Sequence, residues 1–479
     1  MLADAAVPAR PAILQPRVLA GAGVLAASAL AAAAALLVKS ATASLAILAA
    51  GAFGAFLIAA PTYWLALLLV GFIPFHTLIT QYLGGFESSS RQWFAVWKEA
   101  LLAVGTLRAI WDHPNRRAIL HGNRWVLGWS TAFLLIYAVT LLRYPGLPAI
   151  FAISLETKFI AVMVFFLFLN LDAQQAGQLL RLIVWSAGLI SVYGLIQYFW
   201  DYDRLLPLVY SLPDLNIGGA PRLYSYLLNP LEPAFDAAIG ILILFTGAGR
   251  FRLRAALPWL ALLAPCLLLT YTRSALIGLA PAILIVCIAG RERILRYSLI
   301  ATGGLLLACG IALFGGNSIG HSTLAQRLQS IVTRNDDSSY VHKERMDRAM
   351  DTIRKSPWGV GLGGYGTVQA RFSSAADADY AEDCLLQVTV ETGLIGGLVY
   401  LGLTVAVLLT LALRLRQSSG EVRLVCLCVF GVFVALTIAG AMLPIWEELS
   451  TLVFTWALVG ISLSLPFAAP SAPSLSDRT

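Results

Sequence analysis

Charged residues are scarce in this chain. Of its 479 residues, 12% are Asp, Glu, Lys or Arg, whereas 59% are hydrophobic. A soluble domain carries about 25% charged residues. A chain this apolar cannot cover itself with polar surface in water, so a lipid bilayer must be its solvent. The sequence therefore predicts an all-α, polytopic transmembrane bundle, with membrane lipids as its surroundings.

Cysteines in a pairing or metal-binding arrangement are also lacking. The six cysteines are Cys266, Cys287, Cys309, Cys384, Cys426 and Cys428. All but Cys384 lie inside apolar runs, where each fits as a small hydrophobic residue rather than as half of a disulfide. No cysteine and histidine spacing typical of zinc is present. We therefore expect no metal centre and no cofactor.

The formal net charge is +7. In a soluble protein this charge would suggest nucleic acid as a partner. Here the arginines cluster in short loops between apolar segments, so the positive-inside rule explains the charge better and nucleic acid is not expected. Four loops carry the clusters: Arg116, Arg117 and Arg124; Arg250, Arg252 and Arg254; Arg291, Arg293 and Arg296; Arg414, Arg416 and Arg423. Counting spans places all four loops, and both termini, on the cytoplasmic face.

A transmembrane helix needs roughly 20 apolar residues, and by that length we expect about 12 to 14 spans. The candidates begin near residues 18, 42, 62, 92, 125, 151, 177, 230, 257, 274, 296, 384, 422 and 445. The first apolar run is too long for a cleaved signal peptide. The segment from Trp93 is weak because Lys98 and Glu99 interrupt it. The predicted organisation is a bundle over 1–315, a loop over 316–383, further spans over 384–466 and a disordered tail over 467–479.

The loop at 316–383 falls on the non-cytoplasmic face and is long enough to be functional. It contains order signals: a helix is predicted over about 339–355, ended by Pro357. Met346, Ala349, Met350 and Ile353 have helical spacing and predict an apolar stripe that rests on the bundle. His342, Arg345 and Arg348 are expected off that stripe, facing the space above.

Two arginines stand where a membrane span begins. Arg273 lies between two apolar runs with almost no loop, where a charge is costly and functional by default. The alternative is snorkelling to a lipid phosphate. Arg222 opens a segment that leads into a span on the same face, and could equally be an ordinary juxtamembrane charge. Together, the two planar guanidinium groups suggest a diphosphate ligand.

Other motifs have less specific interpretations. Gly361 to Gly366 spells a dinucleotide-binding pattern, but no strand precedes it, so we expect these glycines to form tight turns. The acidic triplets at 201–203 and 377–379 could hold a divalent metal against a diphosphate, but short acidic pairs are common in polar loops, and no metal is assigned to them.

Glu382 and Asp383 immediately precede the span that starts at Cys384. A carboxylate at a helix start can complement the helix dipole. Facing the two arginines, it could instead accept a proton from an acceptor hydroxyl. His342 is the rival base, and ranks second because the sequence shows no side chain that would orient it.

These residues together resemble the O-antigen ligase and Wzy-type polymerase family, best from about residue 218 to 400. The turn at Thr270–Ala275 is similar to the family's Thr-x-Ser-Arg turn, with Thr272 in place of Ser. Arg345 followed by Pro357 to Gly363 is similar to its loop of arginine, helix, proline and glycines. Glu382–Asp383, with Gly393 and Gly396 further on, is similar to a third element, in which ligases have His where this chain has Glu382.

The resemblance implies a polytopic glycosyltransferase of the C type in the bacterial inner membrane. Such an enzyme moves a glycan from an undecaprenyl diphosphate carrier to an acceptor hydroxyl in the periplasm, without a metal. Arg222 and Arg273 would bind the donor diphosphate, Arg345 would support them, and the base would fall on Glu382, with Asp383 beside it.

Three alternatives follow from this comparison. The Glu form favours a polymerase of exopolysaccharide or O-antigen repeats, whose acceptor is a glycan. An O-antigen ligase, whose acceptor is the lipid A-core, is the second possibility. The non-enzyme rival is a lipid-linked glycan flippase, which the sequence supports less because it shows no internal repeat and no charged site at the bilayer midplane.

Overall fold

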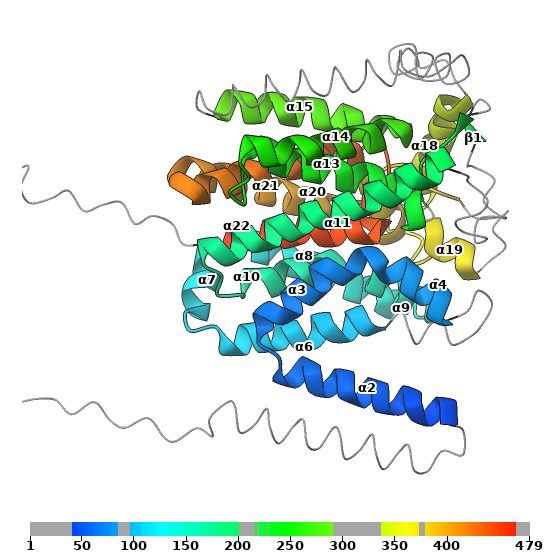
Figure 1. The fold of residues 1–479 in the computed structure, drawn as a ribbon. Helices are drawn as coiled ribbons and strands as arrows, with labels where there is room; N and C mark the ends of the chain where they lie inside the picture. Colours follow the sequence, from blue (N-terminus) through cyan, green and yellow to red (C-terminus); the bar gives the residue numbers. More distant parts are fainter. Residues whose placement is uncertain are drawn as a thin grey trace, which may run out of the picture.

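The computed structural model describes residues 41–84, 96–200, 216–217, 220–227, 229–290, 337–372 and 379–465. These residues are helical nearly throughout (Figure 1). The elements are α2 (Ala41–Ala59), α3 (Thr62–Phe72), η1 (Ile73–Phe75), α4 (His76–Gly84), α6 (Trp97–Asp112), α7 (Arg116–Gly122), α8 (Arg124–Arg143), α9 (Leu147–Glu156), α10 (Lys158–Leu167), α11 (Ala173–Trp200), β1 (Asn216–Ile217), β2 (Ala220–Pro221), η3 (Ser225–Leu227), α13 (Leu231–Thr246), α14 (Leu253–Leu269), α15 (Arg273–Ala289), α18 (Asp337–Lys355), α19 (Gly366–Phe372), α20 (Cys384–Gln417), α21 (Gly420–Gly440), η5 (Ile445–Glu447) and α22 (Leu449–Ser464). The predicted spans near residues 18 and 296, the triplet at 201–203 and the tail at 467–479 lie outside these residues.

Within the described residues, six helical segments are long and apolar enough to cross a bilayer. They are Thr62–Thr80, Arg124–Arg143, Leu147–Leu167, Ala173–Trp200, Cys384–Gln417 and Gly420–Gly440. Shorter apolar helices accompany them at Ala50–Ala59, Arg254–Leu269, Arg273–Ala289 and Leu449–Ser464. The predicted fold class, an all-α polytopic membrane bundle, is confirmed.

The centre of the bundle is formed by α10, α13 and α22, whose side chains are almost all buried. Small residues bring these helices close together. A Cβ on Gly460 of α22 would lie 2.6 Å from the carbonyl oxygen of Met163 in α10. On the outer helices α8 and α20, by contrast, leucines such as Leu142 and Leu398 are exposed, as expected of lipid-facing surface.

The weak span from Trp93 corresponds to α6, which begins at Trp97. The charges that interrupt it lie against a second helix rather than in lipid. Glu99 accepts ion pairs from Lys98 at 3.2 Å and from Lys158 of α10 at 3.1 Å. Both lysines are buried. Pairing across helices therefore accommodates charges that interrupt the apolar run.

The polar helix α18 lies at the same end of the bundle as α19, whereas α7 lies at the opposite end (Figure 1). Only part of the predicted stripe of α18 is buried. Ala349 and Ile353 pack with Tyr365, Ala381 and Val390 in a small apolar cluster. Met346 and Met350 are exposed, so their predicted burial was wrong. The face that contacts the rest of the protein instead carries His342, Arg345, Ala349 and Ile353, because the helix docks through charge as well as apolar contact.

The long helix α20 is broken at Gly393, which has φ 81°. The freed backbone groups are satisfied by the glycine-rich segment 357–361. Val360 N donates to Val390 O at 2.9 Å, Gly361 N to Glu391 O at 3.1 Å, and Leu394 N to Pro357 O at 3.0 Å. A Cβ on Gly359 would lie 2.4 Å from Glu391 O. The glycines of the dinucleotide-like pattern thus serve to bring the loop into contact with the broken helix.

Candidate active site

Two arginines lie at the turn between α14 and α15. Tyr271, with φ 53°, reverses the chain there, and Arg273 begins α15. Arg222 lies across this turn: its Nε donates to Thr270 O at 2.9 Å and its Nη2 to Thr272 Oγ1 at 3.4 Å. A backbone hydrogen bond from Leu223 N to Leu269 O, at 2.9 Å, also holds the segment of Arg222 against this turn. The structure thus places Arg222 against the turn that leads into Arg273, and these are the two arginines that the sequence assigns to a diphosphate.

A second group forms around Glu382, just before α20. His342 Nδ1 lies 3.2 Å from Glu382 Oε2, and Arg345 forms an ion pair with Glu382 Oε1. The Arg345 guanidinium also lies 5.4 Å over the ring of Tyr380. Since His342 and Arg345 are three residues apart on α18, one helical face supplies both partners. The orienting group that the sequence did not reveal for His342 is therefore Glu382.

Glu382 and His342 differ in how exposed their side chains are, and this limits the role that each can take. The Glu382 side chain is 16% exposed, whereas that of His342 is 34% exposed. Burial opposes ionisation of Glu382, but the hydrogen bonds and charges of His342 and Arg345 outweigh it and hold the pKa of its carboxyl below the ordinary value. Glu382 is thus an ionised carboxylate that is already engaged by two donors, and His342 is the more accessible proton acceptor.

Asp383 has a different role in the structure. Its Oδ1 accepts from the backbone N–H groups of Leu385 at 2.6 Å and Leu386 at 3.0 Å, so it is the N-cap of α20. Burial raises the pKa of Asp383, an effect that these two hydrogen bonds oppose. Capping satisfies two N–H groups that a helix start leaves unpaired. It also fixes the backbone at Asp383 and hence the position of the neighbouring residue Glu382.

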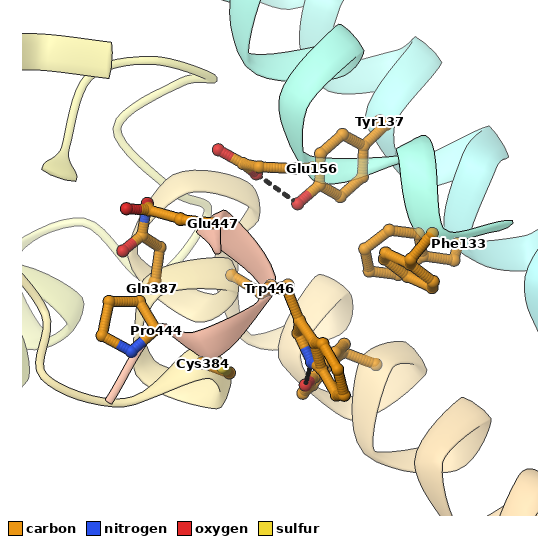
Figure 2. A pocket seen from close by; sticks show the side chains of 11 residues that line it. Phe133, Tyr137, Glu156, Cys384, Gln387, Pro444, Trp446 and Glu447 are labelled. Atoms are coloured by element: carbon orange, nitrogen blue, oxygen red, sulfur yellow. Dashed lines mark hydrogen bonds between the residues drawn. The ribbon is translucent and has the colours of Figure 1, made fainter. Parts of the chain in front are cut away.

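A small cavity adjoins the first turn of α20. Its lining includes Tyr137, Glu156, Gln387 and Glu447, and Figure 2 shows how these side chains lie. Sequence reasoning did not assign a role to Tyr137, Glu156 or Gln387. The signal that could have found Glu156 is its position inside the span Leu147–Leu167, because a carboxylate within a span is a functional candidate by default.

The fold and these residues define a multi-pass membrane protein with two groups of polar side chains, one where α18 meets the start of α20 and one at the turn before α15. Residues 258–401 match the family described as O-antigen ligase, from within α14 to within α20. The resemblance to this family is thereby confirmed over these residues, and the family implies a glycosyltransferase-type enzyme. Arg222 precedes the matched segment. No curated protein matches the chain.

Proposed function

We propose that the chain is an inverting glycosyltransferase of the bacterial inner membrane that transfers a glycan from an undecaprenyl diphosphate carrier to an acceptor hydroxyl. The long loop containing α18 would face the periplasm, and both termini the cytoplasm. The observation that carries the proposal is the pairing of His342 with Glu382 on the α18 face, in a chain that also places Arg222 at the turn of Arg273.

In the proposed reaction the acceptor oxygen attacks the anomeric carbon as the bond from that carbon to the diphosphate oxygen breaks. His342 Nε2 takes the hydroxyl proton, because its Nδ1 is held by Glu382. The carboxylate fixes the ring orientation and stabilises the imidazolium that forms. This reverses the ranking that the sequence favours: Glu382 positions the base, and Arg345 neutralises Glu382.

The leaving diphosphate gains negative charge as the bond breaks. Arg222 and Arg273 would neutralise that charge, since guanidinium groups match the geometry of phosphate oxygens and are always ionised. Arg222 is held by Thr270 O and Thr272 Oγ1, so its position is set before the substrate binds. Such preorganised charge is usually the largest single contribution to stabilising a transition state.

Polymerisation of surface polysaccharide repeats is the favoured form of this reaction, because Glu382 stands where ligases of the family have histidine. Transfer to lipid A-core is the second candidate, supported by the description of the matched family. Purified protein supplied with lipid-linked repeats alone distinguishes the two. A polymerase elongates them, whereas a ligase forms product only after lipid A-core is added.

The same assay tests the base. His342→Ala should lower the rate by about 10²- to 10⁴-fold, the usual contribution of a general base. Arg348→Ala is the matched control, because Arg348 is an exposed cation on the same helix that pairs with Glu344 and Asp379 instead. A His342→Ala enzyme that keeps its rate within twofold of the native protein, with native thermal stability, would overturn the proposal.

A further inference from the structure

Two consecutive carboxyl groups, Glu447 and Glu448, connect distant parts of the bundle. Glu447 is the last residue of η5, and Glu448 is the N-cap of α22. Gln387 Nε2, in the first turns of α20, donates to Glu447 Oε1 at 2.9 Å (Figure 2). Asn229 Nδ2, just before α13, donates to Glu448 Oε1 at 2.6 Å. The two acceptors are adjacent in the chain, whereas their donors come from segments that are far apart in it.

On one side, this connection leads to the start of α20. Gln387 N donates to Asp383 O at 3.0 Å, so Gln387 lies one turn beyond the N-cap Asp383. Glu382 is the residue before that cap. The hydrogen bond from Gln387 to Glu447 therefore helps to hold the helix start that positions Glu382 beside its histidine partner.

On the other side, the connection leads to the turn before α15. Asn229 precedes Pro230, whose carbonyl oxygen accepts from Thr272 Oγ1 at 3.4 Å. The Thr272 hydroxyl in turn accepts from Arg222 Nη2 at 3.4 Å, and Arg273 follows Thr272 in the chain. A path of two hydrogen bonds and one peptide bond therefore runs from Arg222 to Asn229, and from there to Glu448.

The segment that contains η5 is itself fixed to the bundle. Ile445 is fully buried, and Trp446 Nε1 donates to Tyr400 Oη at 2.7 Å. Just before η5, Leu443 O accepts from Cys384 Sγ at 3.2 Å. A segment fixed in this way transmits a displacement from one end to the other, whereas a loose segment would absorb it.

We propose that Glu447 and Glu448 are positioning residues that set the distance between the diphosphate-binding arginines and the base. The inference rests on the proposed function, which requires both groups to act on one substrate: the arginines at the leaving diphosphate and His342 at the attacking hydroxyl. A displacement of roughly 1 Å in groups aligned for a reaction can lower its rate about 10²-fold. The two carboxyl groups contribute through the residues that they hold and not by contact with the reacting atoms.

The test uses two variants whose native side chains bind different carboxyl groups. Gln387→Ala breaks the connection at α20, and Asn229→Ala breaks it near the turn before α15. Each should lower kcat for transfer from lipid-linked repeats by about 10- to 100-fold. The double variant should be no slower than the slower single variant, because a connection that is broken at one end no longer positions the other. The decreases in thermal midpoint should instead add, as expected of separate hydrogen bonds.

Asn123→Ala is the matched control. Asn123 also joins helices, since its Oδ1 accepts from Arg414 Nη2 at 3.0 Å. It directly follows α7, at the end of the bundle opposite α18 and α19 (Figure 1). Asn123→Ala should therefore lower the thermal midpoint but leave kcat within about twofold of the native value, because distant sites act independently.

Amide hydrogen exchange measures the connection without the reaction. In Asn229→Ala, the capped N–H groups of Leu385 and Leu386 should exchange about 2- to 10-fold faster, the effect expected when one supporting hydrogen bond is lost. Asn123→Ala should leave their exchange unchanged. If Asn229→Ala does not fold, Glu448→Ala removes the same hydrogen bond and replaces it in both measurements.

Three results would overturn the inference in a native protein that transfers glycan. The losses of kcat for Gln387→Ala and Asn229→Ala could add in the double variant, both single variants could keep the kcat of the control, or exchange at the start of α20 could stay unchanged. A native protein that transfers no glycan would instead contradict the proposed function, and with it the catalytic role of Glu447 and Glu448. The exchange measurement would then still decide whether the two carboxyl groups connect the two sides.

Discussion

Carboxylates at the loop and in the bundle are satisfied by different kinds of partner. Glu382 lies between His342 and Arg345, which bring positive charge from α18. Asp236, fully buried in α13, accepts from the hydroxyls of Ser450 at 2.6 Å and Thr451 at 3.1 Å. Hydroxyl groups satisfy hydrogen bonds without supplying charge, whereas a histidine can exchange a proton with solvent or substrate. This difference supports the proposed role of Glu382 in positioning the base, and it indicates that Asp236 serves helix packing.

The largest expected effect concerns the loop pair. His342→Ala should reduce the initial rate of glycan transfer by about 10²- to 10⁴-fold. Glu382→Gln should cost less, and the double variant should be no worse than His342→Ala alone, because a positioning residue acts only through the base. Rates from the native protein, the two single variants and the double variant at one substrate concentration give the cycle. A greater loss for Glu382→Gln than for His342→Ala would make Glu382 the base.

The next effect concerns the buried carboxylate. Asp236→Ala removes the acceptor of two hydroxyl groups and should lower the free energy of unfolding by about 1–3 kcal/mol, the cost of leaving buried polar groups unpaired. Chemical unfolding in detergent measures this. Thr131→Ala is the comparison, because Thr131 is exposed on α8 and its hydroxyl bonds only to Leu127 O of its own helix. Equal stability of the two variants would contradict the packing role of Asp236.

A smaller, pH-dependent effect is expected at Glu447, which precedes α22. Burial raises the pKa of Glu447 from 4.5 to about 7, and the hydrogen bond from Gln387 only partly opposes this. The folded protein therefore binds a proton more tightly than the unfolded chain does. The stability that this proton contributes is full below pH 4.5 and is lost as the pH rises towards 7. The thermal midpoint of the native protein should fall more steeply over this interval than that of Glu447→Gln, and parallel profiles would refute the assignment.

The smallest effect is expected at Arg348. Its ion pairs, at 2.5 Å to Glu344 and 3.3 Å to Asp379, join side chains that are each more than 40% exposed. Pairs of this kind contribute about 0–1 kcal/mol. Arg348→Ala should therefore change the free energy of unfolding by about 1 kcal/mol at most and leave the rate of transfer within twofold of the native rate. Arg345→Ala should reduce the rate of transfer, because Glu382 loses its second hydrogen-bond donor. If Arg348→Ala lowers the rate of transfer as much as Arg345→Ala does, the distinction between the docked and exposed faces of α18 is wrong.

The sequence predicts the class of fold and the family, because hydrophobic run length and the loop motifs are local properties of the chain. It does not predict which face of α18 docks. The apolar pattern pointed to Met346 and Met350, but the helix turns so that His342 and Arg345 reach Glu382, some 40 residues away. The ion pair of Lys158 with Glu99 could not be predicted either, because it also joins residues that are far apart in the sequence. The cavity depends on packing among five segments, which no single stretch of sequence encodes.

The break in α20 has a consequence for the order in which the protein assembles. An unbroken helix of 34 residues would be about 51 Å long, well beyond the roughly 30 Å of hydrocarbon in a bilayer. The carbonyl groups of Val390 and Glu391 are satisfied by loop residues that are synthesised earlier but can dock only once α20 is in place. These loop contacts therefore form only after α20 has folded. A side chain at Gly359 should therefore yield a protein that is inserted normally but whose active site never forms.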